Sequence, residues 1–166
     1  MKSFKEYIIC ENKSTQLNEI IDAIYKYLKN TKNGVIELDD LLYRTNDIYK
    51  FYNGKIMKGM FSKFIETSLN DIEDAIKNSN KIYIYEHYPS KTYIYSIHKK
   101  LIDTIYNHLG KDLHNEMISS LEDKDIAFIE QKFNKNIEEI DDYELLKFIV
   151  KNFKNKPMFQ YVEYKN

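Results

Sequence analysis

The stretch that decides the fold is KIYIYEHYPSKTYIYSI, residues 81–97. It consists of two runs rich in isoleucine and tyrosine on either side of Pro89-Ser90. β-Branched and aromatic residues favour strands, and proline suits the second position of a type I turn. The stretch therefore predicts a β-hairpin at the centre of the chain.

The register of this hairpin follows from the separation of its two faces. If Tyr88 faces Lys91, one face holds Ile82, Ile84, Tyr95 and Ile97 and is suited to a core. The other face then carries Tyr83, Tyr85, His87, Thr92, Ile94 and Ser96. A shift by one residue would mix the two sets, so the pattern favours this register.

The second face of the hairpin has two interpretations. Either helices later in the chain cover it, or it is a contact surface whose residues are Tyr83, Tyr85, His87 and Ile94. Tyrosine offers a large, stiff contact area to a protein partner and a platform on which nucleobases can stack.

Helical spacing of apolar residues and turn signals predict the other elements. Before the hairpin we expect a strand at 3–10, a helix at 15–30 that ends at Asn33-Gly34, a strand at 35–38, and helices at 39–45, 57–66 and 68–78. After it we expect helical stripes at 101–109, 113–121, 126–133 and 145–153, with Ser120 and Asp123 as a cap, and an edge strand at 158–164. The fold class is therefore α+β: residues 1–98 form a helical core with the hairpin, and residues 99–166 form a helical C-terminal extension packed on it.

Composition limits the classes of protein to consider. The 166 residues include a single cysteine, Cys10, which excludes an internal disulfide and any all-cysteine zinc site and suits a reducing compartment. The chain lacks the apolar run of a signal peptide and the ~18 consecutive apolar residues of a membrane span. We therefore expect one cytoplasmic domain that has no membrane contact.

No motif identifies a reaction. The four glycines form neither a G-x-G pattern nor a phosphate-binding loop. His108, Asp112 and His114 match no zinc signature, and Gly110 should break the helix between them. Glu86 and His87 are neighbours and so lie on opposite faces of one strand. We predict no catalytic residue, metal or cofactor, while a site assembled from distant residues remains a third hypothesis.

Charge is distributed unevenly along the chain. Residues 1–100 carry a net charge of +3 and residues 101–166 a net charge of −4. Between residues 44 and 63 there are five basic residues, against Asp47 as the only aspartate. Such a cluster is either a solvated surface or a phosphate-binding one. The candidate nucleic-acid-binding residues are Arg44, Lys50, Lys55, Lys58, Lys63, Lys81 and Lys91. Since 24 of the 25 basic residues are lysine, recognition that depends on many arginine forks is excluded.

The order of elements from residue 14 to residue 97 resembles a winged-helix domain. In that family a three-helix core precedes a two-stranded wing, and the last helix before the wing usually enters the DNA major groove. Here that helix, residues 68–78, contains Asp71, Glu73 and Asp74 against Lys77, and acidic residues repel phosphates. The resemblance thus assigns nucleic-acid contacts to the preceding lysines and to the wing, or it implies an adaptor that binds proteins.

These observations lead to ranked hypotheses. The first is a non-enzymatic binding module, a small regulator that contacts nucleic acid or a nucleic-acid-associated protein, with a homodimer also open. The alternative is an inhibitor or adaptor of the kind that phages and plasmids encode, which blocks a host protein by surface contact. That alternative predicts an exposed apolar patch at Tyr83, Tyr85 and Ile94.

Overall fold

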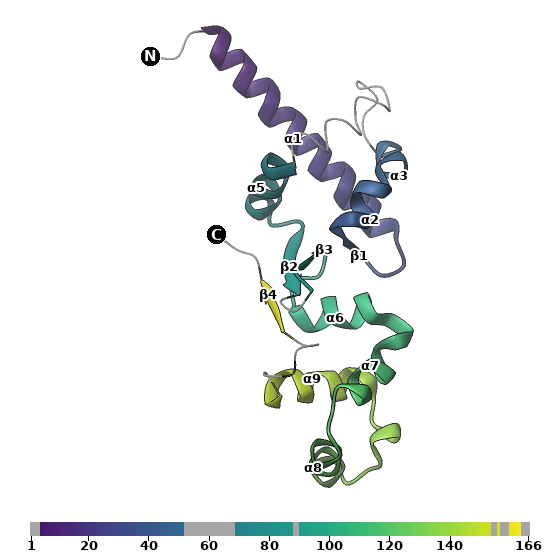
Figure 1. Ribbon diagram of the computed structural model, residues 1–166. Coiled ribbons are helices and arrows are strands. Elements are labelled where there is room, and N and C mark those ends of the chain that lie inside the picture. Colours follow the sequence, from purple (N-terminus) through teal and green to yellow (C-terminus); the bar gives the residue numbers. More distant parts are fainter. Residues whose placement is uncertain (1–3, 52–68, 88–89, 154–155, 157–159, 164–166) are drawn as a thin grey trace.

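The computed structural model describes residues 4–51, 69–87, 90–153, 156 and 160–163. In these ranges the chain is an α+β protein with an antiparallel sheet of strand order β1-β3-β2-β4. The strands are β1 (Val35–Glu37), β2 (Tyr83–His87), β3 (Thr92–Ser96) and β4 (Tyr161–Glu163). Figure 1 shows the sheet across the middle of an elongated molecule, with helices on both sides.

The helices before the hairpin pack on one face of the sheet. They are α1 (Phe4–Asn30), α2 (Leu38–Tyr43), α3 (Thr45–Tyr49) and α5 (Leu69–Ser79). The core they share with the sheet includes Ile20, Ile24, Leu28, Leu41, Ile48, Ile72, Ile76, Ile82, Ile84 and Tyr95. The helical residues of this core recur at helical spacing in the sequence, and Ile82, Ile84 and Tyr95 come from one face of the hairpin. Burial of one apolar stripe per helix against that face explains this layer.

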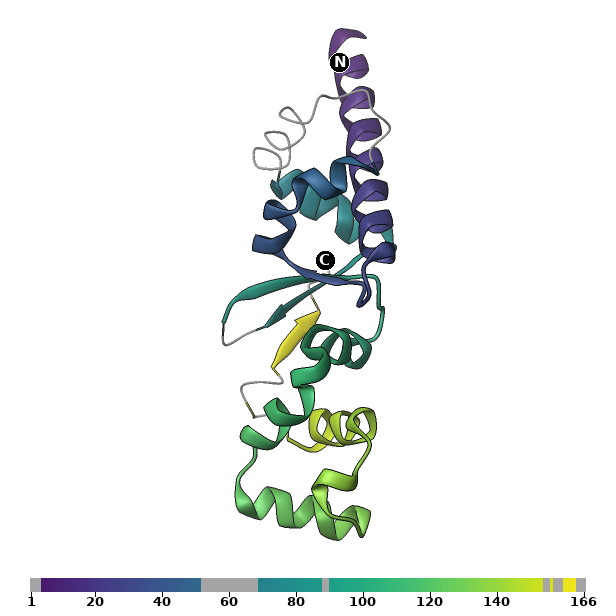
Figure 2. The same ribbon diagram turned by 90° about the vertical axis from the view of Figure 1, so that its right-hand side faces the viewer.

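The helices after the hairpin lie on the other side of the sheet (Figure 2). They are α6 (Leu101–Leu109), α7 (Leu113–Ser119), α8 (Asp123–Phe133) and α9 (Asp142–Asn152), with short 3-10 turns η1 (Gly110–Asp112) and η2 (Ile137–Glu139). They enclose a second core, whose buried members include Ile105, Leu113, Met117, Ile129, Leu145, Leu146 and Ile149. From there the chain returns to the sheet, where β4 pairs with β2.

The predicted hairpin register is confirmed. Ile84 pairs with Tyr95 and Tyr85 with Ile94. Ile82 and Ile84 are buried in the first core together with Tyr95, and Ile97 packs against them. The expected edge strand is also confirmed in position, since β4 lies at the end of the sheet.

The exposed patch expected on the second face of the hairpin is absent. Tyr85 is 1% exposed and Ile94 is 0% exposed. The Tyr85 hydroxyl donates to the carbonyl oxygens of His98 (3.2 Å) and Lys99 (2.7 Å), in the segment that leads into α6. The Thr104 hydroxyl on α6 donates to the buried Ser96 hydroxyl (2.9 Å). Of the two interpretations of this face, coverage by the later helices is correct.

Three local predictions differ from the structure. The strand expected at 3–10 is wrong, because α1 begins at Phe4. No glycine or proline interrupts residues 4–30, and extending a nucleated helix costs far less than starting one. The helix expected at 39–45 is divided into α2 and α3 at Arg44. The cap of α8 is Glu122 with Asp125, not Ser120 with Asp123.

The helix expected at 57–66 lies outside the described residues, whereas the helix expected at 68–78 is present as α5. In the described part of the chain the element order up to the hairpin is α1, β1, α2, α3, α5, β2 and β3, so the expected elements are joined by one further short helix, α3. One feature departs from a free-standing wing: the outer edge of β2 is paired with β4.

Candidate functional site

The most exposed large apolar side chain among the described residues is Tyr43, at the end of α2. Leu41 on the same helix is buried in the first core and Leu42 packs against that core. Tyr43 lies outside it and is 80% exposed. The Arg44 guanidinium carbon lies 5.8 Å from its ring centroid, within the range of a cation–π contact.

Arg44 and Lys50 extend this surface along α3. Asp47 lies between them, 3.9 Å from an Arg44 nitrogen and 3.2 Å from the Lys50 ammonium. The side chains of Arg44 and Lys50 are 53% and 73% exposed, and that of Asp47 is 41% exposed. Ion pairs this exposed contribute about 0–1 kcal/mol, so both cations can exchange Asp47 for a phosphate at little cost. We call Tyr43, Arg44 and Lys50 the Tyr43 surface.

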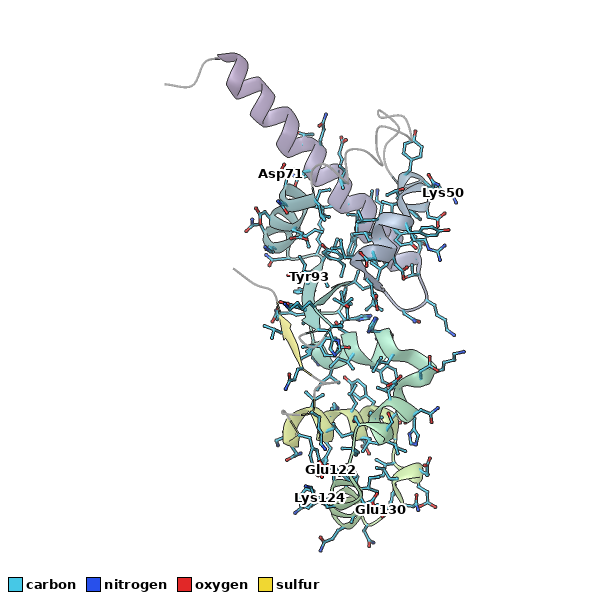
Figure 3. All side chains as sticks on the ribbon, viewed as in Figure 1. Lys50, Asp71, Tyr93, Glu122, Lys124 and Glu130 are labelled. Carbon is cyan, nitrogen blue, oxygen red and sulfur yellow. The ribbon has the colours of Figure 1, made fainter. Side chains whose placement is uncertain are left out.

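The structure separates this surface from the acidic helix α5. Figure 3 shows Lys50 and Asp71 well apart, on either side of α1. Glu73 on α5 accepts a hydrogen bond from the Tyr95 hydroxyl (3.3 Å), and Asp74 contacts Lys77 (3.5 Å). The carboxylates of α5 therefore do not line the Tyr43 surface.

The other candidate basic residues are not brought to one place. The Lys81 ammonium forms an ion pair with Asp22 on α1, at 2.5 Å. Lys91 is exposed at the tip of the hairpin, where its φ is +54°. Lys55, Lys58 and Lys63 lie outside the described residues. The described residues thus bring together only Arg44 and Lys50 of the predicted set.

The four candidate partner-binding residues do not form a shared exposed surface. Tyr85 and Ile94 are buried, and burial raises the pKa of Tyr85 to about 12. Tyr83 is half-buried, and its hydroxyl donates to the Asn80 carbonyl (3.2 Å). The His87 ring lies 4.8 Å from the Tyr161 ring. These four residues therefore contribute to the sheet and to its contacts with the neighbouring segments.

The two histidines considered for a metal site have separate partners. His108 Nε2 lies 2.9 Å from Glu37 Oε1, which joins α6 to β1. His114 lies between Asp142 and Glu138, with one ring nitrogen directed at each carboxylate. Within the ranges that the structure describes, no group of three or more His, Cys, Asp or Glu residues could hold a metal ion.

One shallow pocket, of about 410 Å³, lies between α8 and η2. Its lining residues are Glu130, Asn134, Lys135 and Asn136. Glu130 Oε1 is already hydrogen-bonded to the backbone N–H of Ile137 (3.0 Å). No histidine lines this pocket, so it does not present the pairing of histidine and acid that a concealed hydrolytic site would need.

The Tyr43 surface is the feature that sequence reasoning missed. Arg44 and Lys50 were identified from charge alone, but the ring beside them was not. The available signal was a tyrosine directly before the basic segment and directly after two leucines, Leu41 and Leu42.

In comparisons with known proteins, no family model, no curated protein and no solved structure matches this chain. None of the described helices is both long and apolar enough to cross a membrane. A functional assignment therefore depends on the chemistry of the described side chains and on the sequence.

Proposed function

We propose that the chain is a non-enzymatic binding module, a small regulator that contacts nucleic acid through the Tyr43 surface and the lysine-rich segment that continues from it. The observation that carries this proposal is the 80% exposed Tyr43 ring, with the Arg44 guanidinium beside it. Tyr43 directly precedes residues 44–63, which contain five basic residues.

Each part of this arrangement has a role in nucleic-acid binding. An exposed aromatic ring can stack with a base, which contributes about 1–3 kcal/mol and tolerates any sequence. Lysines neutralise phosphates and release counterions, so they make binding sensitive to salt. Because lysine lacks the planar fork of arginine, we expect weak sequence preference.

The resemblance to winged-helix domains also supports nucleic-acid binding, but through a surface other than the helix that precedes the wing. The helix before the hairpin, α5, carries Asp71, Glu73 and Asp74, which disfavour its insertion into a groove. Since β4 occupies the edge of β2, the hairpin offers chiefly its tip, with Lys91. We therefore assign the main contacts to α2, α3 and the segment that follows.

The test is binding to labelled single-stranded and duplex DNA and RNA, measured by fluorescence anisotropy from about 50 to 200 mM salt. The variant replaces Lys55, Lys58 and Lys63 by Glu. The control replaces Lys132, Lys135 and Lys151 by Glu, the same change of charge made at exposed positions in the other half of the molecule. If each lysine contacts one phosphate, the first variant lowers the salt slope by about 1 per lysine lost.

The role of the aromatic ring is tested separately with Tyr43→Ala. Tyr106→Ala is its control, since Tyr106 is also an exposed tyrosine but lies on α6, in the acidic half of the chain. We expect Tyr43→Ala alone to weaken binding. Absence of binding at low salt would refute the proposal, and equal losses in test and control variants would show that the surface is assigned wrongly.

The inhibitor or adaptor hypothesis predicted an exposed apolar patch on the hairpin. Because Tyr85 and Ile94 are buried, no observation on the hairpin now favours that hypothesis over nucleic-acid binding.

A further inference from the structure

His114 on α7 connects three elements of the C-terminal half. Its Nδ1 lies 2.6 Å from Asp142 Oδ1, at the first residue of α9. Its Nε2 lies 2.8 Å from Glu138 Oε2, in η2. The side chain is partly buried, being 22% exposed. A single imidazole ring thus joins α7 to η2 and to the first turn of α9.

The two contacts require both nitrogens of the His114 ring to donate a hydrogen bond. A carboxylate oxygen can only accept a hydrogen bond, so each ring nitrogen must carry a proton to donate. A neutral imidazole carries one proton, and its other nitrogen would direct a lone pair at a carboxylate. Both contacts can therefore form together only when His114 is the charged imidazolium.

We propose that His114 is a proton-dependent clasp, which fastens α7 to η2 and to the start of α9 when protonated and releases one of them when it loses a proton. This proposal is independent of nucleic-acid binding. It concerns the second core, because α7 and α9 bury Leu113, Met117 and Leu145 there.

The surrounding charges favour the protonated ring. The hydrogen bond to Asp142 is the main cause that raises the pKa of His114, burial opposes it, and Glu138 raises it further. Other ionisable groups on the elements packed around His114 are predominantly acidic or neutral: Lys111 and Asp112 on η1, Glu116 on α7, Glu139 on η2, and Asp141, Tyr143 and Glu144 at the start of α9.

The direction of the pH effect follows from the raised pKa. A group whose pKa is higher in the folded state stabilises the fold fully below its unfolded value, about 6.5 for histidine. That stabilisation is lost as the pH rises through the pKa of the folded state. The clasp therefore closes in acidic solution and opens as the solution becomes alkaline.

The test follows the His114 ring by NMR titration and follows the amides of η2 and of the first turn of α9 by hydrogen exchange, corrected for the intrinsic pH dependence of exchange. We expect the His114 midpoint to lie above the ordinary histidine value and to fall in Asp142→Asn and Glu138→Gln. The protection of these amides should decrease with the same midpoint.

Two further variants separate a clasp from ordinary packing. In His114→Gln, which keeps a side-chain donor but cannot titrate, protection at η2 and α9 should no longer change at that midpoint. His108→Gln is the matched control, because His108 contacts a single carboxylate, Glu37, on a different element. It should leave the pH profile of α9 unchanged.

A His114 midpoint at or below the ordinary value would overturn the proposal. So would constant protection of η2 and α9 across the midpoint. Because both measurements use the unmodified chain, they decide the question even if His114→Gln does not fold.

Discussion

Removal of the Tyr85 hydroxyl tests directly whether the segment that leads into α6 covers the second face of the hairpin. Tyr85→Phe removes one oxygen and leaves the ring in place. That oxygen donates to the carbonyls of His98 (3.2 Å) and Lys99 (2.7 Å). The shorter of the two contacts, to the Lys99 carbonyl, determines most of the loss.

The expected cost follows from removing a partly buried hydrogen bond. Loss of such a bond destabilises a protein by about 0.5–1.5 kcal/mol. For a chain of this length each kcal/mol lowers the Tm by roughly 2–4 °C. We therefore expect Tyr85→Phe to lower the Tm by a few degrees and to reduce the free energy of unfolding measured in urea by about 0.5–1.5 kcal/mol.

Tyr83→Phe is the matched control, on the same strand and with the same atom removed. The Tyr83 hydroxyl donates to Asn80 in an exposed hydrogen bond, so its loss should change the stability by less than about 0.5 kcal/mol. Thermal and urea unfolding of both variants measure the difference. Equal, small effects would refute the burial of Tyr85 and restore an exposed second face of the hairpin.

Three other perturbations test separate features. Gly34→Ala should destabilise by about 1–3 kcal/mol in urea unfolding, because φ is +67° and the added carbon would lie 2.8 Å from Ile97. Asp141→Ala should cost about 0.5–2 kcal/mol, measured by thermal unfolding, since its carboxylate caps two backbone N–H groups of α9. Burial raises the pKa of Tyr161 to about 12, so the stability that its neutral form contributes should remain up to pH ~10 and be lost toward the raised pKa, as followed by phenolate absorbance and circular dichroism.

The hairpin and the helices after it were predictable because their signals are local. Alternation in the sequence set the register of Ile84 with Tyr95. Gly110, at φ +55°, ends α6 as its position after a helical stripe predicts. The apolar stripe at 145–153 predicted α9, and Asp141 caps the start of that helix.

The prediction of an N-terminal strand was wrong because the strand propensity of a few residues competed with the helical pattern of a longer segment. Residues 7–9, Tyr-Ile-Ile, favour a strand in isolation. In the chain they continue α1, whose stripe from Ile20 to Leu28 is fixed by packing against α3 and α5. Tertiary packing of a helix commonly outweighs the propensity of its end.

The candidate site was predictable only in part. Charge along the sequence identified Arg44 and Lys50, but the exposure of Tyr43 depends on how α2 rests on the first core. The contacts of His114 join residues 24 and 28 positions apart, and no spacing rule relates such residues.

The sequence by itself determined which hairpin residues share a face, because side chains alternate along a strand. Only the tertiary structure decided what each face meets. The face with Tyr85 and Ile94 is buried because the chain folds back over it directly after the hairpin, where the His98 carbonyl accepts from Tyr85 and Thr104 contacts Ser96. Alternation along a strand determines which side chains share a face. Whether a face is buried depends on other segments of the chain, and the sequence of the strand does not contain that information.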